Sequence, residues 1–384
     1  MQTVLGGLSA LGGGFVGYVL PFLFVLTLVV FFHELGHFLV ARRCGIRVLV
    51  FSIGFGPELF GFFDRHGTRW KVSAVPLGGY VKFLGDESAA STPDRSALET
   101  LSEADRKEAF ISQKVSARAA VVAAGPIANF ILAIVIFAGI FAVVGKQTTS
   151  ARVDTVQPDS AAARAGFQPG DIVRSIDGSR IESFSDMQRI VSTSAGVPLT
   201  IEIERGNAIR TLKATPDLKD VKDPFGNSQR MGVLGITRSM LPGDIKVERV
   251  DPITAVGLGA EQAWFVVEHT FLYIRDVFAG RQSADQLGGP IRIAQVSGQV
   301  CHSFSACMHL SGVLSVSIGL LNLFPIPLLD GGHLLFYLIE AVRGRPLSDR
   351  AQEVGFRIGL AIVVMLMIFA TFNDIRGLLH LATS

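Results

Sequence analysis

Two histidines and a glutamate interrupt a long apolar stretch near the N-terminus, in FFHELGHFLVARR (Phe31 to Arg43). The first 32 residues contain no charged side chain, and the residues from about Phe15 to Ala41 are enough to cross a bilayer as a helix. Neither the positive start nor the small-residue cleavage site of a signal peptide is evident. We therefore expect a retained transmembrane helix, inside which ionisable groups are costly unless they are paired or functional.

The composition places the chain among membrane proteins. Of its 384 residues, 49% are hydrophobic, and the mean hydropathy is +0.44, which is high for a soluble protein of this length. Three more apolar spans follow, at about 117–144, 310–338 and 356–372. The net charge of +2, without basic runs that alternate with aromatic residues, argues against a nucleic-acid partner. We predict a polytopic α-helical protein with four transmembrane helices in a lipid bilayer.

Positive charge orients the predicted helices, because lysine and arginine accumulate in cytoplasmic loops. Such residues follow the first span, precede the second and separate the third from the fourth; they are Arg42, Arg43 and Arg47, then Lys107, Lys114 and Arg118, then Arg343, Arg345 and Arg350. The histidines near Arg42 then lie toward the cytoplasm, and the long segment from Lys146 to about His309 lies on the opposite side.

The two histidines have the spacing of a zinc site. His33 and His37 are four residues apart, so a helix presents both rings on one face, where they can reach a single ion. In H-E-x-x-H enzymes the glutamate, here Glu34, is the general base that deprotonates the zinc-bound water. The same pattern arises by chance in soluble helices, but three such side chains inside an apolar span are difficult to explain by packing alone.

A catalytic zinc site needs a third protein ligand and one open position. Asp330 is the best candidate, since it lies in LLNLFPIPLLDGGHLLF near the cytoplasmic end of the third span. Pro325 and Pro327 cannot continue a regular helix, and broken helices inside membranes usually line polar cavities. His333, three residues further on, is the alternative ligand.

Together, HELGH and Asn322-x-x-Pro325-x-Pro327-x-x-Asp330-Gly331-Gly332 resemble the site-2 protease family of intramembrane zinc metalloproteases, in particular its bacterial regulator-of-sigma-E protease branch. The segments GFGP and GGYVKFLGDE and the FND after the fourth span extend this resemblance over nearly the whole chain. It implies an inner-membrane protein with a Zn²⁺ cofactor and its active site toward the cytoplasm. The implied roles are zinc binding by His33, His37 and Asp330, base catalysis by Glu34, and substrate binding by Asn322 and by an edge strand that contains Gly79, Tyr80 and Val81.

The expected organisation follows the four spans. Residues 1–145 hold the first two helices and a membrane-associated cytoplasmic β-element at about 44–113, with a polar loop and short helix from 86 to 107. Residues 146–216 resemble a periplasmic α+β PDZ domain, with RAGFQPGDIVRSIDG as its signature and a second helix capped by Ser183 or Ser185. Residues 217–308 form a linker with an amphipathic helix at about 256–280, and residues 309–384 hold the last two helices and the third ligand. The branch can carry two PDZ domains, whereas one is clear here.

Two cysteines near the third span do not suggest a disulfide. Cys301 and Cys307 could pair in an oxidising compartment, but a helix through CHSFSACMH would turn them to different faces, so we expect them to be unpaired. The spacing of its cysteines and histidines also fits no zinc template.

We predict an intramembrane endopeptidase that cuts transmembrane segments of single-pass membrane proteins. The resemblance to site-2 proteases implies an anti-sigma factor or a remnant signal peptide as the substrate. The PDZ domain would either bind a peptide or exclude bulky ectodomains. One alternative is an inactive scaffold that binds clients through the PDZ domain, but a scaffold needs neither Glu34 nor the ligands. Another is a metal transporter, which the lack of an inverted repeat disfavours.

Overall fold

The structure, a computed structural model, describes residues 2–85, 101–222, 228–238, 245–280, 284 and 288–383. The chain divides into two compact units, which we describe one at a time. The first comprises Met1–Ile140, Val256–Phe271 and Gly288–Asp374, and the second comprises Phe141–Ala255, Leu272–Leu287 and Ile375–Ser384.

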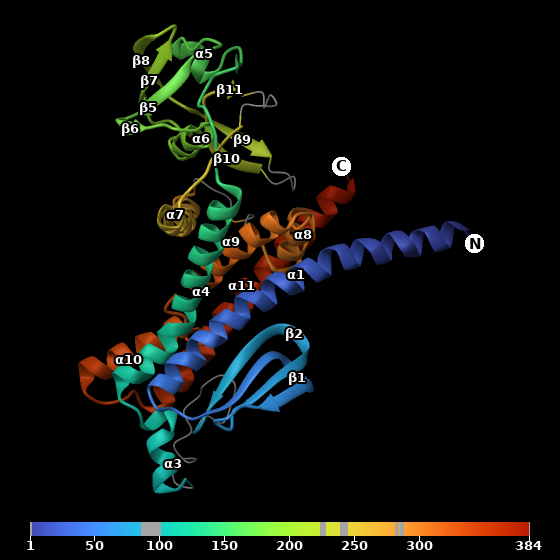
Figure 1. The fold of residues 1–384 in the computed structure, drawn as a ribbon, viewed down its shortest axis with the longest axis vertical. Helices are drawn as coiled ribbons and strands as arrows, with labels where there is room; N and C mark the ends of the chain where they lie inside the picture. The colour runs from blue at the N-terminus through green and yellow to red at the C-terminus, as the bar shows by residue number, and fades with distance from the viewer. Residues whose placement is uncertain are drawn as a thin grey trace. The chain divides into compact units, whose positions relative to one another are not determined.

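Within the described ranges, four helices are long and apolar enough to cross a membrane, as predicted. They are α1 (Gln2–Arg43), α4 (Val115–Val144), α9 (Phe304–Asn322) and α11 (Asp349–Thr383), each labelled in Figure 1. The predicted break in the third span is present. Helix α9 ends at Asn322, and the shorter helix α10 (Asp330–Arg343) begins only after the two prolines.

Small residues bring α1 and α4 into close contact. A Cβ atom on Gly36 of α1 would lie 2.8 Å from both the Ala124 carbonyl carbon and the Ala128 Cβ of α4. Non-bonded contacts of Cβ atoms in proteins are essentially never shorter than 3.0 Å. Without a hydrophobic effect between helices in lipid, such close backbone packing is what holds them together.

A sheet lies beside the C-terminal half of α1 (Figure 1). It is formed by β1 (Val48–Phe63) and β2 (Arg69–Phe83), both within the β-element expected at about 44–113. Fully buried Phe51 packs here against Phe38 of α1, so the sheet and the helix share one core.

The pairing register gives this sheet two outer edges. Residues 48–53 pair with 79–83, and part of the same segment also pairs with 69–72. Residues 55–63 pair with 69–75. Among the described residues, the segments 79–83 and 55–63 are therefore each paired on one side only.

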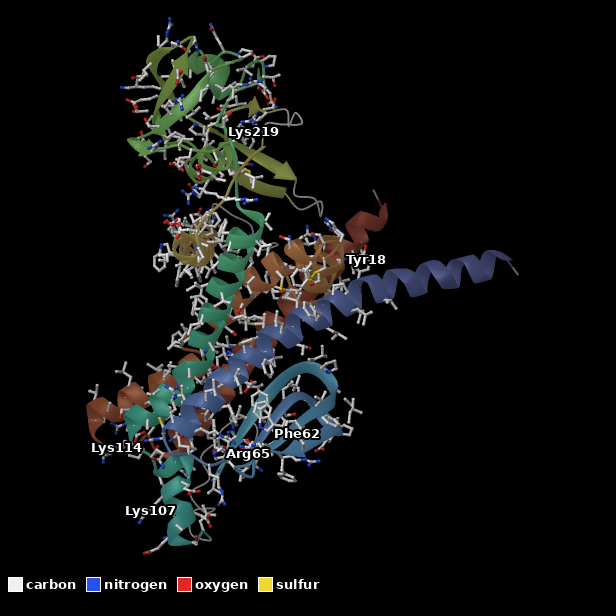
Figure 2. All side chains as sticks on the ribbon, in the orientation of Figure 1. Tyr18, Phe62, Arg65, Lys107, Lys114 and Lys219 are labelled. Carbon is white, nitrogen blue, oxygen red and sulfur yellow. A yellow bond between two sulfur atoms is a disulfide. The ribbon has the colours of Figure 1, made fainter. Side chains whose placement is uncertain are left out.

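The polar stretch after the sheet contains the predicted short helix. Residues 86–100 lie outside the described ranges, but α3 (Glu103–Glu108) follows, with Ser102 as its N-cap. A single turn, η1 (Phe110–Ser112), then leads into α4. Lys107 and Lys114 lie at this end of the first unit, whereas Tyr18 lies toward the other end (Figure 2).

Two helices precede α9. Helix α7 (Pro252–Phe278) is the predicted amphipathic helix, and it begins a few residues earlier than expected. Helix α8 (Pro290–Val300) was not predicted, and it packs against α1. Its N-cap Gly289 has no side chain with which to cap the helix. Instead Asp374 of α11 accepts hydrogen bonds from the backbone N–H groups of Gly289, Ile291 and Arg292, at 2.9, 3.1 and 3.1 Å.

The expectation of unpaired cysteines near α9 was wrong. Cys301 is the C-cap of α8, whereas Cys307 lies inside α9, so the two do not share one helix. Their Cα atoms are 4.3 Å apart and the sulfur atoms form a disulfide, which leaves Cys44 as the free cysteine.

The second unit is an α+β fold. Its main sheet has the order β6-β5-β7-β8, with neighbouring strands antiparallel. These strands are β5 (Ile172–Ile176), β6 (Ser179–Arg180), β7 (Leu199–Arg205) and β8 (Ala208–Ala214). The core between this sheet and the helices α5 (Ala161–Ala165) and α6 (Phe184–Thr193) includes fully buried Val173, Ile201 and Ile203. Ser183 caps α6 in a capping box with Asp186, which confirms the first of the two predicted caps.

Three strand pairs complete this unit. β3 (Lys146–Thr149) pairs with β12 (Ile245–Glu248), β4 (Thr155–Val156) with β11 (Ile236–Thr237), and β9 (Asp217–Lys222) with β10 (Ser228–Val233). Buried Leu234 joins the same core, so the packed structure continues beyond residue 216.

Candidate metal centre

Three side chains from distant parts of the sequence converge in the first unit. The Nε2 atoms of His33 and His37 are 3.2 Å apart, and the Asp330 Oδ2 atom lies 3.1 Å from the first and 3.6 Å from the second. The three side chains expose only 11%, 11% and 18% of their surface. The sequence suggested this group, and the structure brings all three together.

These distances fit a shared metal ion. Two ligand atoms about 2.0 Å from a tetrahedral zinc ion stand roughly 3.3 Å from each other. The three observed separations, 3.1, 3.2 and 3.6 Å, scatter around that value. One carboxylate and two neutral imidazoles also match the mixed N and O donor set of catalytic zinc sites.

The hydrogen bonds at the site leave lone pairs that point inward. His37 Nδ1 lies 2.8 Å from the Val121 carbonyl oxygen, which can only accept, so Nδ1 carries the ring hydrogen and donates it. In a neutral His37 ring the Nε2 atom then keeps a lone pair. The Asp330 Oδ2 atom is buried and faces the two histidine Nε2 atoms. Lone pairs that face one another without a proton between them would repel, and a cation removes that repulsion.

Asp330 is delivered by a strained loop. In the loop between α9 and α10, Leu328 has φ = 106°, a left-handed value that is rare for a side chain of this kind. A Cβ atom on Gly331 would lie 2.5 Å from the Leu323 carbonyl carbon, and one on Gly332 would lie 2.5 Å from Pro327 Cα. The two glycines therefore allow the first turn of α10, which begins at Asp330, to press against the loop.

The predicted base and the predicted substrate strand are neighbours. A Cβ atom on Gly79 would lie 3.0 Å from Cγ of Glu34 and 2.9 Å from Val30 of the same helix. The backbone N–H of Val81 lies close enough to the Glu34 carboxylate to interact with it electrostatically. Tyr80, between them, stacks on Phe55 with ring centroids 6.1 Å apart. The edge segment 79–83 thus runs past Glu34.

Other candidates from the sequence lie outside the group of three. The alternative ligand His333 is not in it, and its ring packs against Phe356 at 5.4 Å. Asn322 is the last residue of α9 and is partly buried. In CHSFSACMH, the His309 ring packs against Phe137, and the two cysteines are joined.

The sequence interpretation missed the part that α4 plays. Val121, Gly125 and Asn129 follow one another at intervals of four residues, and all three face the histidines. The Asn129 amide lies 3.3 Å from His33 Nδ1. An asparagine inside an apolar span, after a Gly-Pro pair, is the signal that could have indicated this role, because a polar group at that depth needs a partner.

Comparison with known proteins identifies the chain. Residues 21–366 match the family model described as Peptidase family M50. This chain belongs to peptidase family M50. The match covers α4, the loop before α10 and all three converging side chains, and it confirms the resemblance to site-2 proteases.

Relatives of this M50 peptidase agree with that assignment. A protein named as a zinc metalloprotease in Rhizobium meliloti is 54% identical over 94% of this chain and 97% of its own length. The metalloprotease MmpA of Caulobacter vibrioides is 39% identical over 94% of this chain and 96% of its own. The regulator of sigma-E protease RseP of Salmonella typhimurium is 30% identical over 93% of this chain and 98% of its own. The M50 peptidase is thus a hydrolase of the zinc metalloprotease class.

A solved PDZ domain, from the SdrC-like protein of Listeria monocytogenes, aligns with 22% of this chain and 83% of that domain. The two are 22% identical, with a TM-score of 0.18. We therefore keep the PDZ assignment as a proposal.

Proposed function

We propose that this M50 peptidase is an intramembrane zinc endopeptidase that cuts transmembrane segments of single-pass membrane proteins. An anti-sigma factor or a remnant signal peptide would be a substrate of this kind. The proposal rests on where the metal-binding group lies. Its three ligand atoms are within 4.8 Å of one another, and they come from an apolar helix that can cross a membrane and from the break that follows another such helix.

In this proposal His33, His37 and Asp330 would hold the ion and leave it accessible to a water molecule. A bound zinc ion polarises the scissile carbonyl and lowers the pKa of a bound water. Glu34, on the helix turn between the histidines, takes the proton from the attacking water and later passes it to the leaving amine. The nearby Val81 N–H would favour a Glu34 carboxylate on the side of the edge segment.

A transmembrane substrate must unwind before it is cut, because a helix hides its carbonyls in backbone hydrogen bonds. The edge segment 79–83 supports a way to hold the unwound chain, since an extended peptide can pair with an open strand edge. Gly79, Tyr80 and Val81 would then place the peptide beside Glu34. Asn322, at the end of α9, would bind the substrate backbone close to the metal.

Charge supports a cytoplasmic position for the site. Arg42 and Arg43 end α1 just beyond His37, and Lys107 and Lys114 lie near the start of α4 (Figure 2). Residues 146–216 would then be a PDZ domain in the periplasm of an inner-membrane protein. Such a domain would bind a peptide or keep bulky ectodomains from the membrane-embedded site.

A trapping experiment tests the proposal. Glu34→Gln keeps the three ligands and removes the base, so it should retain zinc and lose about 10²- to 10⁴-fold in cleavage rate. Crosslinking in cells followed by mass spectrometry should recover single-pass proteins on this variant, and the wild type should cut them within their spans. Glu261→Gln, an exposed carboxylate of α7, is the control and should cleave normally.

Each alternative gives a different result. Clients that bind both forms equally and are never cut would support the scaffold. Zinc flux into vesicles that contain the wild-type protein, without any cleavage, would support a transporter.

A further inference from the structure

We propose that Asn129 of α4 is a positioning residue that accepts a hydrogen bond from His33 and thereby fixes the ring that binds zinc. The inference rests on the proposed metal site and extends it to a helix that supplies no ligand. Asn129 is fully buried, and its amide is 3.3 Å from His33 Nδ1.

The tautomer of His33 decides which end of the amide must face it. The Nε2 atom of His33 is the one that points toward His37 and Asp330. When a neutral imidazole binds a metal through Nε2, the ring hydrogen is on Nδ1, which can then only donate. Asn129 must therefore present an acceptor to His33.

The side chain of Asn129 has that acceptor to offer. Its Oδ1 atom is buried and has no hydrogen-bond partner within the described part of the chain. The amide nitrogen and oxygen have nearly the same shape, so a half-turn of the amide exchanges them without displacing any neighbour. Before the half-turn, the Asn129 NH₂ group and the His33 Nδ1–H, both donors, face each other. After it, Asn129 Oδ1 accepts a hydrogen bond from His33 Nδ1–H.

Helix α4 then supplies a hydrogen-bond acceptor to the Nδ1–H of each histidine. Val121 O accepts from Nδ1 of His37, and eight residues later Asn129 accepts from Nδ1 of His33. Gly125 lies midway, where the rings come closest to the helix. The Ser315 hydroxyl donates to the Asn129 backbone oxygen at 2.8 Å and holds this turn of α4 against α9.

Zinc affinity of the full-length protein in detergent tests the assignment, measured by competition with a chromophoric chelator. Asn129→Leu keeps the size of the side chain and removes the acceptor, so zinc should bind about 10- to 100-fold more weakly. Asn129→Asp keeps an acceptor oxygen and loses the amide donor, so its affinity should stay within a few-fold of wild type or rise. Ser315→Ala, which disturbs the packing around Asn129 without touching His33, should bind zinc as wild type does.

The absorption spectrum of the cobalt-substituted protein gives a second readout, because it reports the geometry of the ligands and not the stability of the fold. It should change in Asn129→Leu and be preserved in Asn129→Asp and Ser315→Ala. If Asn129→Leu does not fold, Asn129→Ser replaces it, since its shorter hydroxyl does not reach His33. Wild-type affinity and spectrum in Asn129→Leu or Asn129→Ser would overturn the inference, as would an equal loss in Asn129→Asp. Failure of the underlying metal site is distinguishable, because wild-type protein would then bind no more zinc than His33→Ala.

Discussion

Gly125 of α4 stands where any side chain would collide with His37. A Cβ atom there would lie 2.5 Å from Cε1 of His37, closer still to its Nε2 atom, and 2.9 Å from Cε1 of His33. The two imidazole rings therefore occupy the volume that a side chain at position 125 would fill. Gly125→Ala should push the rings off the ion and weaken zinc binding roughly 100-fold, at the upper end of the loss seen when ligand support is removed.

The same helix provides the control for Gly125→Ala. Gly139 has no atom within 4 Å of where its Cβ would be. Gly139→Ala should leave zinc binding unchanged and stabilise α4 by up to about 1 kcal/mol, the difference in helix propensity between the two residues. Equal zinc affinity in both variants would show that Gly125 is not needed for the rings.

The disulfide predicts how the cysteines react. Alkylation of the denatured, unreduced protein should label Cys44 alone, and reduction should expose all three cysteines of the chain. The reason is that the pair persists only in an oxidising compartment, where the proposed orientation places the turn between α8 and α9. Three labels before reduction would contradict both the bond and the orientation. Cys44→Ser should show no label until the protein is reduced.

Asp374 should control the stability of the first turn of α8. Asp374→Ala leaves the N–H groups of Gly289, Ile291 and Arg292 without their acceptor. Loss of a helix cap costs about 1–2 kcal/mol, so these amides should exchange with deuterium about 5- to 30-fold faster. Asp251→Ala is the matched control, since Asp251 caps its own helix, α7, through Ile253 and Thr254. Its effect should be confined to the start of α7, and unchanged exchange in Asp374→Ala would refute the role of Asp374.

A buried ion pair should make the second unit sensitive to acid. Arg205 donates two hydrogen bonds, of 2.6 and 2.7 Å, to the fully buried carboxylate of Asp171. Burial acts to raise the pKa of Asp171, but the hydrogen bonds from Arg205 and from the Gln168 backbone outweigh it and hold this pKa below its ordinary value of 3.8. A lowered pKa in the folded state means that the contribution to stability is complete above pH 3.8 and disappears as the pH falls through the lowered value.

Asp171→Asn tests this pair. It should destabilise the sheet around β5 and β7 by about 3 kcal/mol at neutral pH, because it leaves Arg205 without its counter-charge. The difference from wild type in amide exchange should shrink below pH 3.8. Glu204→Gln, which breaks the more exposed pair with Arg174 on the same strands, should change stability by no more than about 0.5 kcal/mol. An acid-independent difference between wild type and Asp171→Asn would argue against the role of the charge.

Local patterns were enough to predict much of the fold and part of the site. The four-residue spacing of His33 and His37 specifies a shared helix face, whatever surrounds it. Pro325 and Pro327 predict a break in the third span. Asp330 follows that break, and a carboxylate at this depth in a membrane is most readily explained as a ligand for a cation. The four apolar helices followed from length and hydropathy alone, because the bilayer permits few alternatives.

Features that depend on contacts between distant segments could not be predicted. The capping of α8 by Asp374 joins residues 85 positions apart, and no local signal marks it. The disulfide was missed because the expectation assumed one continuous helix, whereas α8 ends at Val300 and Cys301 is its C-cap. Likewise, Asn129 could be recognised as unusual, but its partner His33 became evident only when α1 and α4 were seen together.

The separation of the ligands along the chain has a consequence for synthesis. In the proposed site His33 and His37 emerge with the first helix, but Asp330 emerges only after the whole outer segment has been made. A nascent chain in the membrane therefore carries two ligands of three, and it cannot hold the ion firmly or cleave its neighbours. In this proposal the complete ligand set exists only once the last seventh of the chain is being translated, so the unfinished enzyme would not cut single-pass proteins that it meets during its own synthesis.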